Sequence, residues 1–114
     1  MRTRLMAAIR LASSGEESLA RLHSLHDMAR HAGFDTLAAI SRAHLTDRLL
    51  IDRRFAEAAE LAARYIAAGE ILPRARALIL NNLAQALIEL GRFAEAHAAA
   101  RAAITALPSL VAMV

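Results

Sequence analysis

The sequence contains no cysteine, no tryptophan and no lysine among its 114 residues. Without cysteine, the chain cannot form disulfides, bind zinc through thiolates or use a thiol nucleophile. Proline, glycine and aromatic residues are also scarce, with two prolines, four glycines and four aromatics, and the only valines are Val111 and Val114. A β-sheet domain needs β-branched residues and many turns, so this composition predicts an all-α fold.

Long hydrophobic runs are missing as well. No apolar stretch approaches the length of about 20 residues that a membrane-spanning helix needs. The basic start, residues 1–14, is interrupted by Arg10 and is followed by no convincing cleavage site, which argues against a secretory signal. A mitochondrial presequence is the alternative to an ordinary first helix there. We expect a cytoplasmic protein with no membrane segment.

The charge of the chain comes from arginine and acids only. All 14 basic residues are arginines, which face 11 acids and leave a formal charge of +3. This charge gives only weak attraction for anionic partners. The bias toward alanine and arginine is typical of GC-rich coding and favours a bacterial source.

A pentapeptide, Arg-Phe-Ala-Glu-Ala, occurs at Arg54–Ala58 and again 38 residues later at Arg92–Ala96. The chain is three times that period long, which predicts three units covering residues 1–38, 39–76 and 77–114. The period aligns further small or aliphatic residues in columns: Leu11, Leu49 and Leu87; Ala8, Thr46 and Ala84; Ala20, Ala58 and Ala96; Met28, Ile66 and Ile104.

Each unit is predicted to hold two helices joined by a short loop. The first helix ends at Ser13-Ser14-Gly15, and the second covers about 17–32 and ends at Gly33. The third helix is capped by Asp35 or Thr36 and reaches about Ile51, and the fourth covers about 54–69. The fifth has Pro73 in its first turn and reaches Leu90, and the sixth ends before Pro108. Short loops make neighbouring helices antiparallel, so we expect six helices in three stacked hairpins. Stacking would bury a continuous core, with Phe55 and Phe93 between adjacent units.

The third unit resembles a tetratricopeptide repeat. The resemblance lies in Asn82-Leu83-Ala84, Leu87, Gly91, Phe93, Glu95-Ala96, Ala103-Ile104 and Pro108. It extends partly to the second unit and loosely to the first. The period is longer than the family's usual value of about 34 residues, Ala100 stands where a large aromatic is common, and Arg42 and Leu80 stand where tryptophan is frequent. The longer period is similar to that of helical repeats in large bacterial transcription regulators and signalling ATPases.

This resemblance implies a right-handed superhelix with a concave groove lined by the first helix of each unit. Members of the family mostly bind peptides, helices or other subunits. The residues that the resemblance places in the groove form an apolar strip with a few amide and acid groups: Leu5, Ile9, Ile40, Ala43, Asp47, Leu50, Leu78, Asn81, Gln85, Ile88 and Glu89. Asn82 is of a type used in the chaperone-like carboxylate clamp, but it is more often structural in such repeats. We therefore expect a protein-interaction or assembly module, as part of a larger bacterial regulator.

No catalytic or metal constellation stands out. His23, Asp27 and His31 share one stripe of a helix and could hold zinc, but the apolar residues lie on the opposite face, which favours a solvated stripe. No paired general acid and base is evident, and the four glycines are spread over helix ends rather than forming a phosphate loop. We expect a non-enzyme with no cofactor.

The arginines suggest the alternative function, binding of RNA or DNA. Arg4 and Arg42 are equivalent under the repeat, as are Arg10 and Arg48, and such a ladder could bind carboxylates or phosphates. We favour local ion pairs with Asp47 and Asp52 instead. The modest net charge and the expected core position of the aromatics also favour a protein partner over a nucleic acid.

The last residues, 109–114, form an apolar tail without a charge. An exposed run of this kind needs a cover. The tail could fold back, pair with a second copy or continue into a missing repeat. A two-fold pairing is the commonest solution for soluble proteins, so we expect a homodimer through Leu110, Val111, Met113 and Val114.

Overall fold

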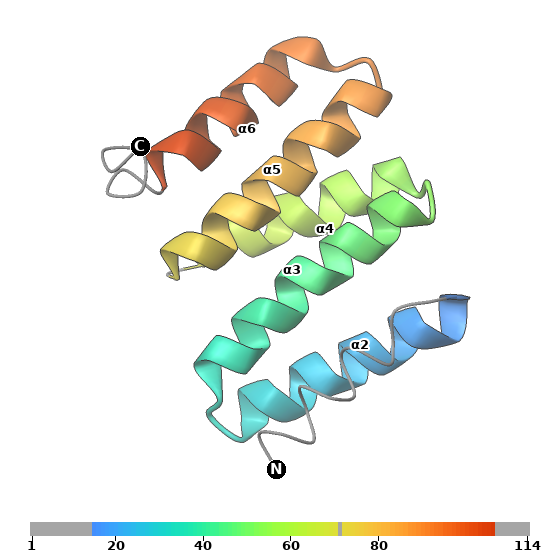
Figure 1. Ribbon diagram of the computed structural model, residues 1–114, viewed down its shortest axis with the longest axis vertical. Coiled ribbons are helices and arrows are strands. Elements are labelled where there is room, and N and C mark those ends of the chain that lie inside the picture. The colour runs from blue at the N-terminus through green and yellow to red at the C-terminus, as the bar shows by residue number, and fades with distance from the viewer. Residues whose placement is uncertain (1–14, 71, 107–114) are drawn as a thin grey trace.

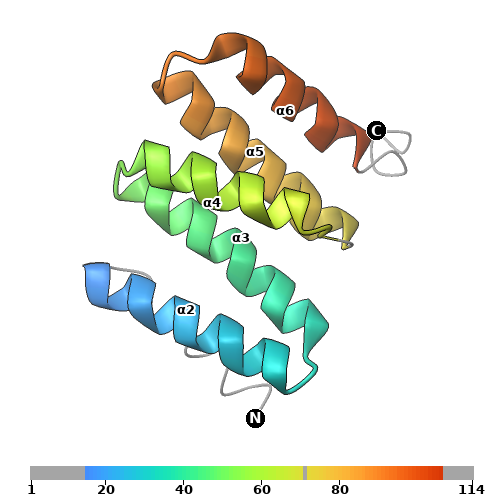
Figure 2. The ribbon, with the colours of Figure 1, turned by 180° about the vertical axis from the view of Figure 1, so that it is seen from behind.

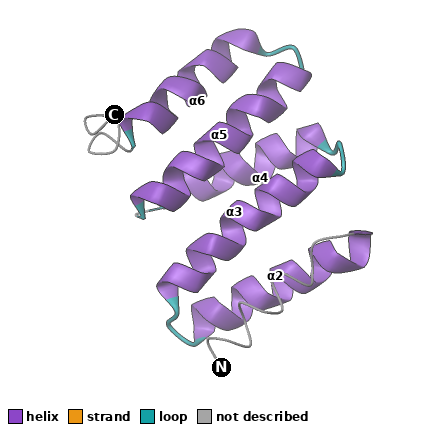
Figure 3. Ribbon diagram, viewed as in Figure 1, coloured by secondary structure: helices purple, strands orange, loops and turns teal. Residues whose placement is uncertain are grey.

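The computed structural model describes residues 15–70 and 72–106, and this part of the chain consists of helices and short loops without any strand (Figure 3). The helices are α2 (Gly15–His31), α3 (Asp35–Ile51), α4 (Phe55–Ala67), α5 (Pro73–Glu89) and α6 (Phe93–Thr105). The predicted all-α class is therefore confirmed, with five helices in the described range. The expected first helix lies outside the described residues.

The helices follow one another as antiparallel neighbours. Figure 1 shows α2, α3, α5 and α6 in succession, with α3 and α5 side by side. Helix α4 packs across both α3 and α5, and Figure 2 shows it from the other side. Among the described residues, the backbones of α2, α4 and α6 do not come close to one another. Helices α3 and α5 thus connect α2, at one end of the described part, to α6 at the other.

The boundaries of α5 and α6 follow those of α3 and α4 at a constant offset of 38 residues, at both ends of each helix. The turns between the paired helices also match. Arg53 and Gly91 both adopt left-handed backbone conformations, with φ of 60° and 75°. In each turn the next amide donates to a leucine carbonyl five residues earlier, Arg54 to Leu49 and Arg92 to Leu87, at 2.8 Å. Such bonds satisfy carbonyls that a helix end would leave unpaired.

The expected left-handed glycine at the end of α2 is present, because Gly33 has φ of 77°. The predicted cap of α3 by Asp35 or Thr36 is wrong. The N-cap residue is Phe34, and its side chain makes no capping hydrogen bond. The turn explains the shift: the Phe34 amide bonds the Ala29 carbonyl, while its own carbonyl already accepts from Ala38. The helix therefore starts directly after the glycine turn.

The 38-residue period fails in α2. Helix α2 ends at His31, only 36 residues before the end of α4 at Ala67, because the loop between α4 and α5 is two residues longer than the loop between α2 and α3. The predicted column of small core residues is correspondingly wrong at Ala20, which is exposed, whereas Ala58 and Ala96 are buried. Met28 is likewise exposed. The face that α2 turns toward the core carries leucines instead: Leu19, Leu22 and Leu25.

The described core consists mostly of leucine and alanine on all five helices. Alanine has the highest helix propensity, and its short side chain lets helices approach closely. Of the two phenylalanines expected between units, Phe55 is half-buried and Phe93 is 66% exposed. The expectation for Phe93 is therefore wrong in the described structure, where no helix packs over it.

Exchanging the two equivalent left-handed residues tests the match between the turns. Gly91→Arg should lower the free energy of unfolding by about 1 kcal/mol, because a residue with a side chain is strained at positive φ. A Cβ atom at Gly91 would meet nothing within 4 Å, so the loss of stability would reflect backbone strain alone. Arg53→Gly should raise the free energy of unfolding by about 0.5 kcal/mol. Urea denaturation measures both, and an unchanged stability for Gly91→Arg would contradict the argument.

Candidate functional site

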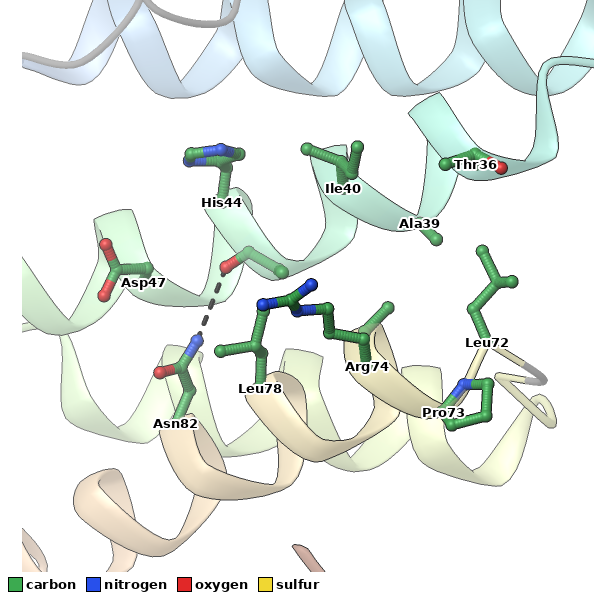
Figure 4. A pocket seen from close by; sticks show the side chains of 12 residues that line it. Thr36, Ala39, Ile40, His44, Asp47, Leu72, Pro73, Arg74, Leu78 and Asn82 are labelled. Carbon is green, nitrogen blue, oxygen red and sulfur yellow. Dashed lines mark hydrogen bonds between the residues drawn. The ribbon is translucent and has the colours of Figure 1, made fainter. Parts of the chain in front are cut away.

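An open cavity of about 520 Å³ lies between α3 and α5 (Figure 4). We call it the α3–α5 groove. Its wall on α3 extends from Thr36 to Asp47, and its wall on α5 extends from the preceding loop to Asn82. Most of its lining is apolar: Ala39, Ile40, Ala43, Leu72, Pro73, Ala75 and Leu78. A concave, largely apolar surface of this kind suits a hydrophobic ligand or the apolar side of a peptide.

Side-chain size explains why the groove is hollow, and a polar contact closes one end. Several lining residues are alanines, which fill little space between the helices. The buried Asn82 side chain donates from Nδ2 to Thr46 Oγ1 at 2.8 Å, and Thr46 donates to the Ala43 carbonyl at 2.9 Å. Asn82 thus joins α5 to α3, which agrees with a structural role.

Three charged or titratable groups border this apolar surface: His44 and Asp47 on α3 and Arg74 on α5. Figure 4 shows the Arg74 side chain reaching from α5 toward α3. Neither Arg74 nor Asp47 has an ion pair within the described part of the chain. The groove therefore offers one cation and one anion to a ligand whose remaining contacts are apolar.

Four of the residues predicted to bind a partner lie in this groove: Ile40, Ala43, Asp47 and Leu78. The others are distributed differently. Leu50 is half-buried and packs against the core, while the remaining predicted residues of α5 are exposed outside the groove lining: Asn81, Gln85, Ile88 and Glu89. Leu5 and Ile9 lie outside the described residues, as do Leu110, Val111, Met113 and Val114 of the predicted dimer contact, so that contact stays a prediction.

A second cavity, of about 770 Å³, lies among α2, α3, the end of α4 and the following loop. We call it the α2–α4 cavity, and it shares only Leu72 with the groove. Most of its lining residues have polar or charged side chains: His23, His26, Arg30, Asp35, Arg42, Leu61, Arg64, Tyr65, Ala68, Gly69, Glu70 and Leu72. The sequence pattern did not indicate this cavity, because its residues come from four separate segments with no common spacing.

A buried ion pair forms one wall of this cavity. Arg42 Nε donates to Glu70 Oε1 at 2.7 Å, and the Glu70 side chain is only 1% exposed. The Leu72 amide lies 3.4 Å from Glu70 Oε2. Glu70 belongs to the longer loop after α4, so the two additional residues of that loop bring a carboxylate to Arg42. The position of Glu70 in the sequence did not predict its contact with Arg42.

The predicted arginine ladder is not a row of free cations in the described structure. Arg42 pairs with Glu70, and Arg48 Nε donates to Asp52 at 3.1 Å, as the local-pairing interpretation expected for Arg48. That hydrogen bond lowers the pKa of Asp52. The equivalent residues Arg4 and Arg10 lie outside the described residues.

His26 completes the polar network. Arg42 Nη1 lies 3.1 Å from His26 Nε2, and since a guanidinium only donates, the imidazole nitrogen must accept. Burial, and then the positive charge of Arg42, lower the pKa of His26 below its usual range. The His26 ring also lies 6.0 Å from the ring of Tyr65, whose pKa burial raises to about 12. The hydrogen bond from Arg42 and the burial of the ring therefore keep His26 neutral near pH 7.

The histidine stripe considered for zinc has other contacts. Asp27 places its carboxylate 3.4 Å from His26 Nδ1, and the ring of His31 lies 2.8 Å from the Asp27 carbonyl. Within the described residues, no group of three metal-ligating side chains is arranged to hold an ion.

No described helix combines the length and hydropathy needed to cross a membrane. In comparisons with known proteins, the chain matches no family model, no curated protein and no solved structure.

Removing the carboxylate of the buried pair should destabilise the protein. Glu70→Gln should lower the free energy of unfolding by about 2 kcal/mol, because it leaves the largely buried Arg42 without its counter-charge. Glu95→Gln is the matched control, since the Arg92–Glu95 pair is exposed on both sides and should contribute little. Equal losses for the two variants in chemical denaturation would contradict a special role for Glu70.

Stability should fall as the pH drops below about 6.5. An unfolded histidine takes up a proton near its ordinary pKa of 6.5, whereas folded His26 resists protonation because its pKa is lowered. The unfolded state then binds more protons than the folded state, so acidification favours unfolding. His26→Gln should reduce the difference in melting temperature between pH 7.5 and pH 5.5, whereas His97→Gln, at an exposed position of α6, should leave it unchanged. The same pH dependence in wild type and His26→Gln would refute this assignment.

Proposed function

We propose that this chain is a non-catalytic protein-interaction module that binds an amphipathic segment of a partner protein in the α3–α5 groove. The observation that carries the proposal is an uncovered apolar cavity with Asp47 on one wall and Arg74 on the other. Apolar burial supplies most of the free energy in such peptide sites, at about 25 cal/mol per Å². The charged groups would orient the bound segment.

A tetratricopeptide-like repeat architecture is part of this proposal. Three observations support an internal repeat. The helix boundaries share one offset, the left-handed turns match, and the ion pair Arg54–Glu57 has its equivalent in Arg92–Glu95. In that family the groove is lined by the first helix of each unit, which here corresponds to α3 and α5. A right-handed superhelix and a place within a larger bacterial regulator belong to the same proposal.

The groove chemistry defines the ligand. Apolar side chains of the partner would fill the space over Ala43 and Leu78, and an acidic residue would pair with Arg74. A basic or donor group would lie near Asp47. A nucleic acid fits this surface poorly, because phosphates need several free cations and Arg74 is the only arginine among the described residues that line the groove.

Peptides selected from a random display library against the full chain provide the test. Leu78→Arg should weaken their binding at least about tenfold, because a charge replaces an apolar contact at the centre of the groove. Ile88→Arg is the matched control on the same helix. The two residues are equally exposed, at 50% and 51%, but Ile88 lies outside the groove lining. Fluorescence anisotropy gives the affinities, and circular dichroism checks that each variant remains helical.

Ala43→Arg, on the opposite wall, should repeat the effect of Leu78→Arg. The groove proposal is wrong if the selected peptides bind both groove variants as tightly as wild type, or if Ile88→Arg weakens them equally. Binding of single-stranded RNA or DNA that is lost steeply with added salt, with no peptide binder found, would instead support the nucleic-acid function.

A further inference from the structure

The α2–α4 cavity brings together arginines from three helices. Arg30 comes from the last turn of α2, Arg42 from α3 and Arg64 from the last turn of α4. These residues are far apart in sequence, and the fold places them around one cavity. Two acids share the lining, Asp35 and Glu70, and Glu70 is already bound to Arg42. The side chains around the cavity therefore carry an excess of positive charge.

Arg42 is held in a fixed position that leaves donors unused. Its Nε donates to Glu70 and its Nη1 donates to His26, whereas its Nη2 makes no hydrogen bond with the described residues. A guanidinium has five N–H donors in a rigid plane. Two contacts thus fix the plane of the group, and the remaining donors can bind an oxygen anion without reorganisation.

Arg30 and Arg64 add two flexible cations at the rim. Both are exposed, and neither forms an ion pair with any residue of the described part. Each balances the negative end of its own helix in part, but a helix end does not use the five donors of a guanidinium. Tyr65 and His23 supply further polar groups in the same lining.

We propose that the α2–α4 cavity binds a small molecule through an anionic oxygen group, a phosphate or a carboxylate. Arg42 forms the fixed part of the site, and Arg30 and Arg64 close on the anion from α2 and α4. This site is separate from the α3–α5 groove, and neither proposal requires the other. Its volume of about 770 Å³ leaves room for an organic group beyond the anion.

The test uses the full chain at low ionic strength, because salt screens exposed charges. Inorganic phosphate, pyrophosphate and citrate are titrated and followed by histidine and arginine side-chain NMR signals. Arg30→Gln and Arg64→Gln should each weaken binding about tenfold. Arg101→Gln removes the same charge from an exposed position of α6 outside the cavity and should leave the affinity unchanged.

Tighter binding of pyrophosphate than of citrate would identify a phosphate-bearing ligand. Tighter binding of citrate would identify a ligand with a carboxylate. Both outcomes support the site. An equal loss in all three variants would overturn it, because the attraction would then be diffuse. Absence of saturable binding in the millimolar range would overturn it as well. Thermal melts of Arg30→Gln and Arg64→Gln confirm that both variants fold before their affinities are compared.

Discussion

The Arg42–Glu70 ion pair is the contact on which the two cavities depend. It joins α3 to the loop between α4 and α5, and His26 extends the same network to α2. The Glu70 carbonyl lies 3.5 Å from Arg76 Nη1, which links the loop to α5 as well. Leu72, two residues after Glu70, lines both cavities. A buried carboxylate needs a partner with good geometry, so this pair fixes where the loop lies and thus where both cavities end.

The small side chains of the helix faces have two opposite effects. Where helices meet, alanines such as Ala58 and Ala96 allow close packing, and the leucines fill the remaining volume. Between α3 and α5, Ala39, Ala43 and Ala75 leave a groove open because their side chains fill little space. Asn82 and Thr46 hold the two helices together beside that groove. The same residue type therefore closes the core and leaves the α3–α5 groove open.

The period of 38 residues describes the helices from α3 onward better than it describes α2. From α3 to α6 the boundaries repeat without error, down to the left-handed residue in each turn. Between α2 and α4 the shorter first loop shifts the register by two residues, which rotates the buried face of α2 away from Ala20 and toward Leu22 and Leu25. The additional residues of the later loop include Glu70, so the departure from the period coincides with the polar network.

The resemblance to a repeat family suggested Ile40, Ala43, Asp47 and Leu78, which lie in the α3–α5 groove. Local rules in the sequence were sufficient for the helical class, the glycine turns at Gly33 and Gly91 and Pro73 at the start of α5. These features depend on backbone preferences and helical periodicity, which act between near neighbours in the chain. The exposure of Phe93, the burial of Glu70 and the meeting of His26 with Arg42 depended on packing between segments 16 or more residues apart. Loop length and helix crossing decide such contacts, and neither leaves a periodic signal in the sequence.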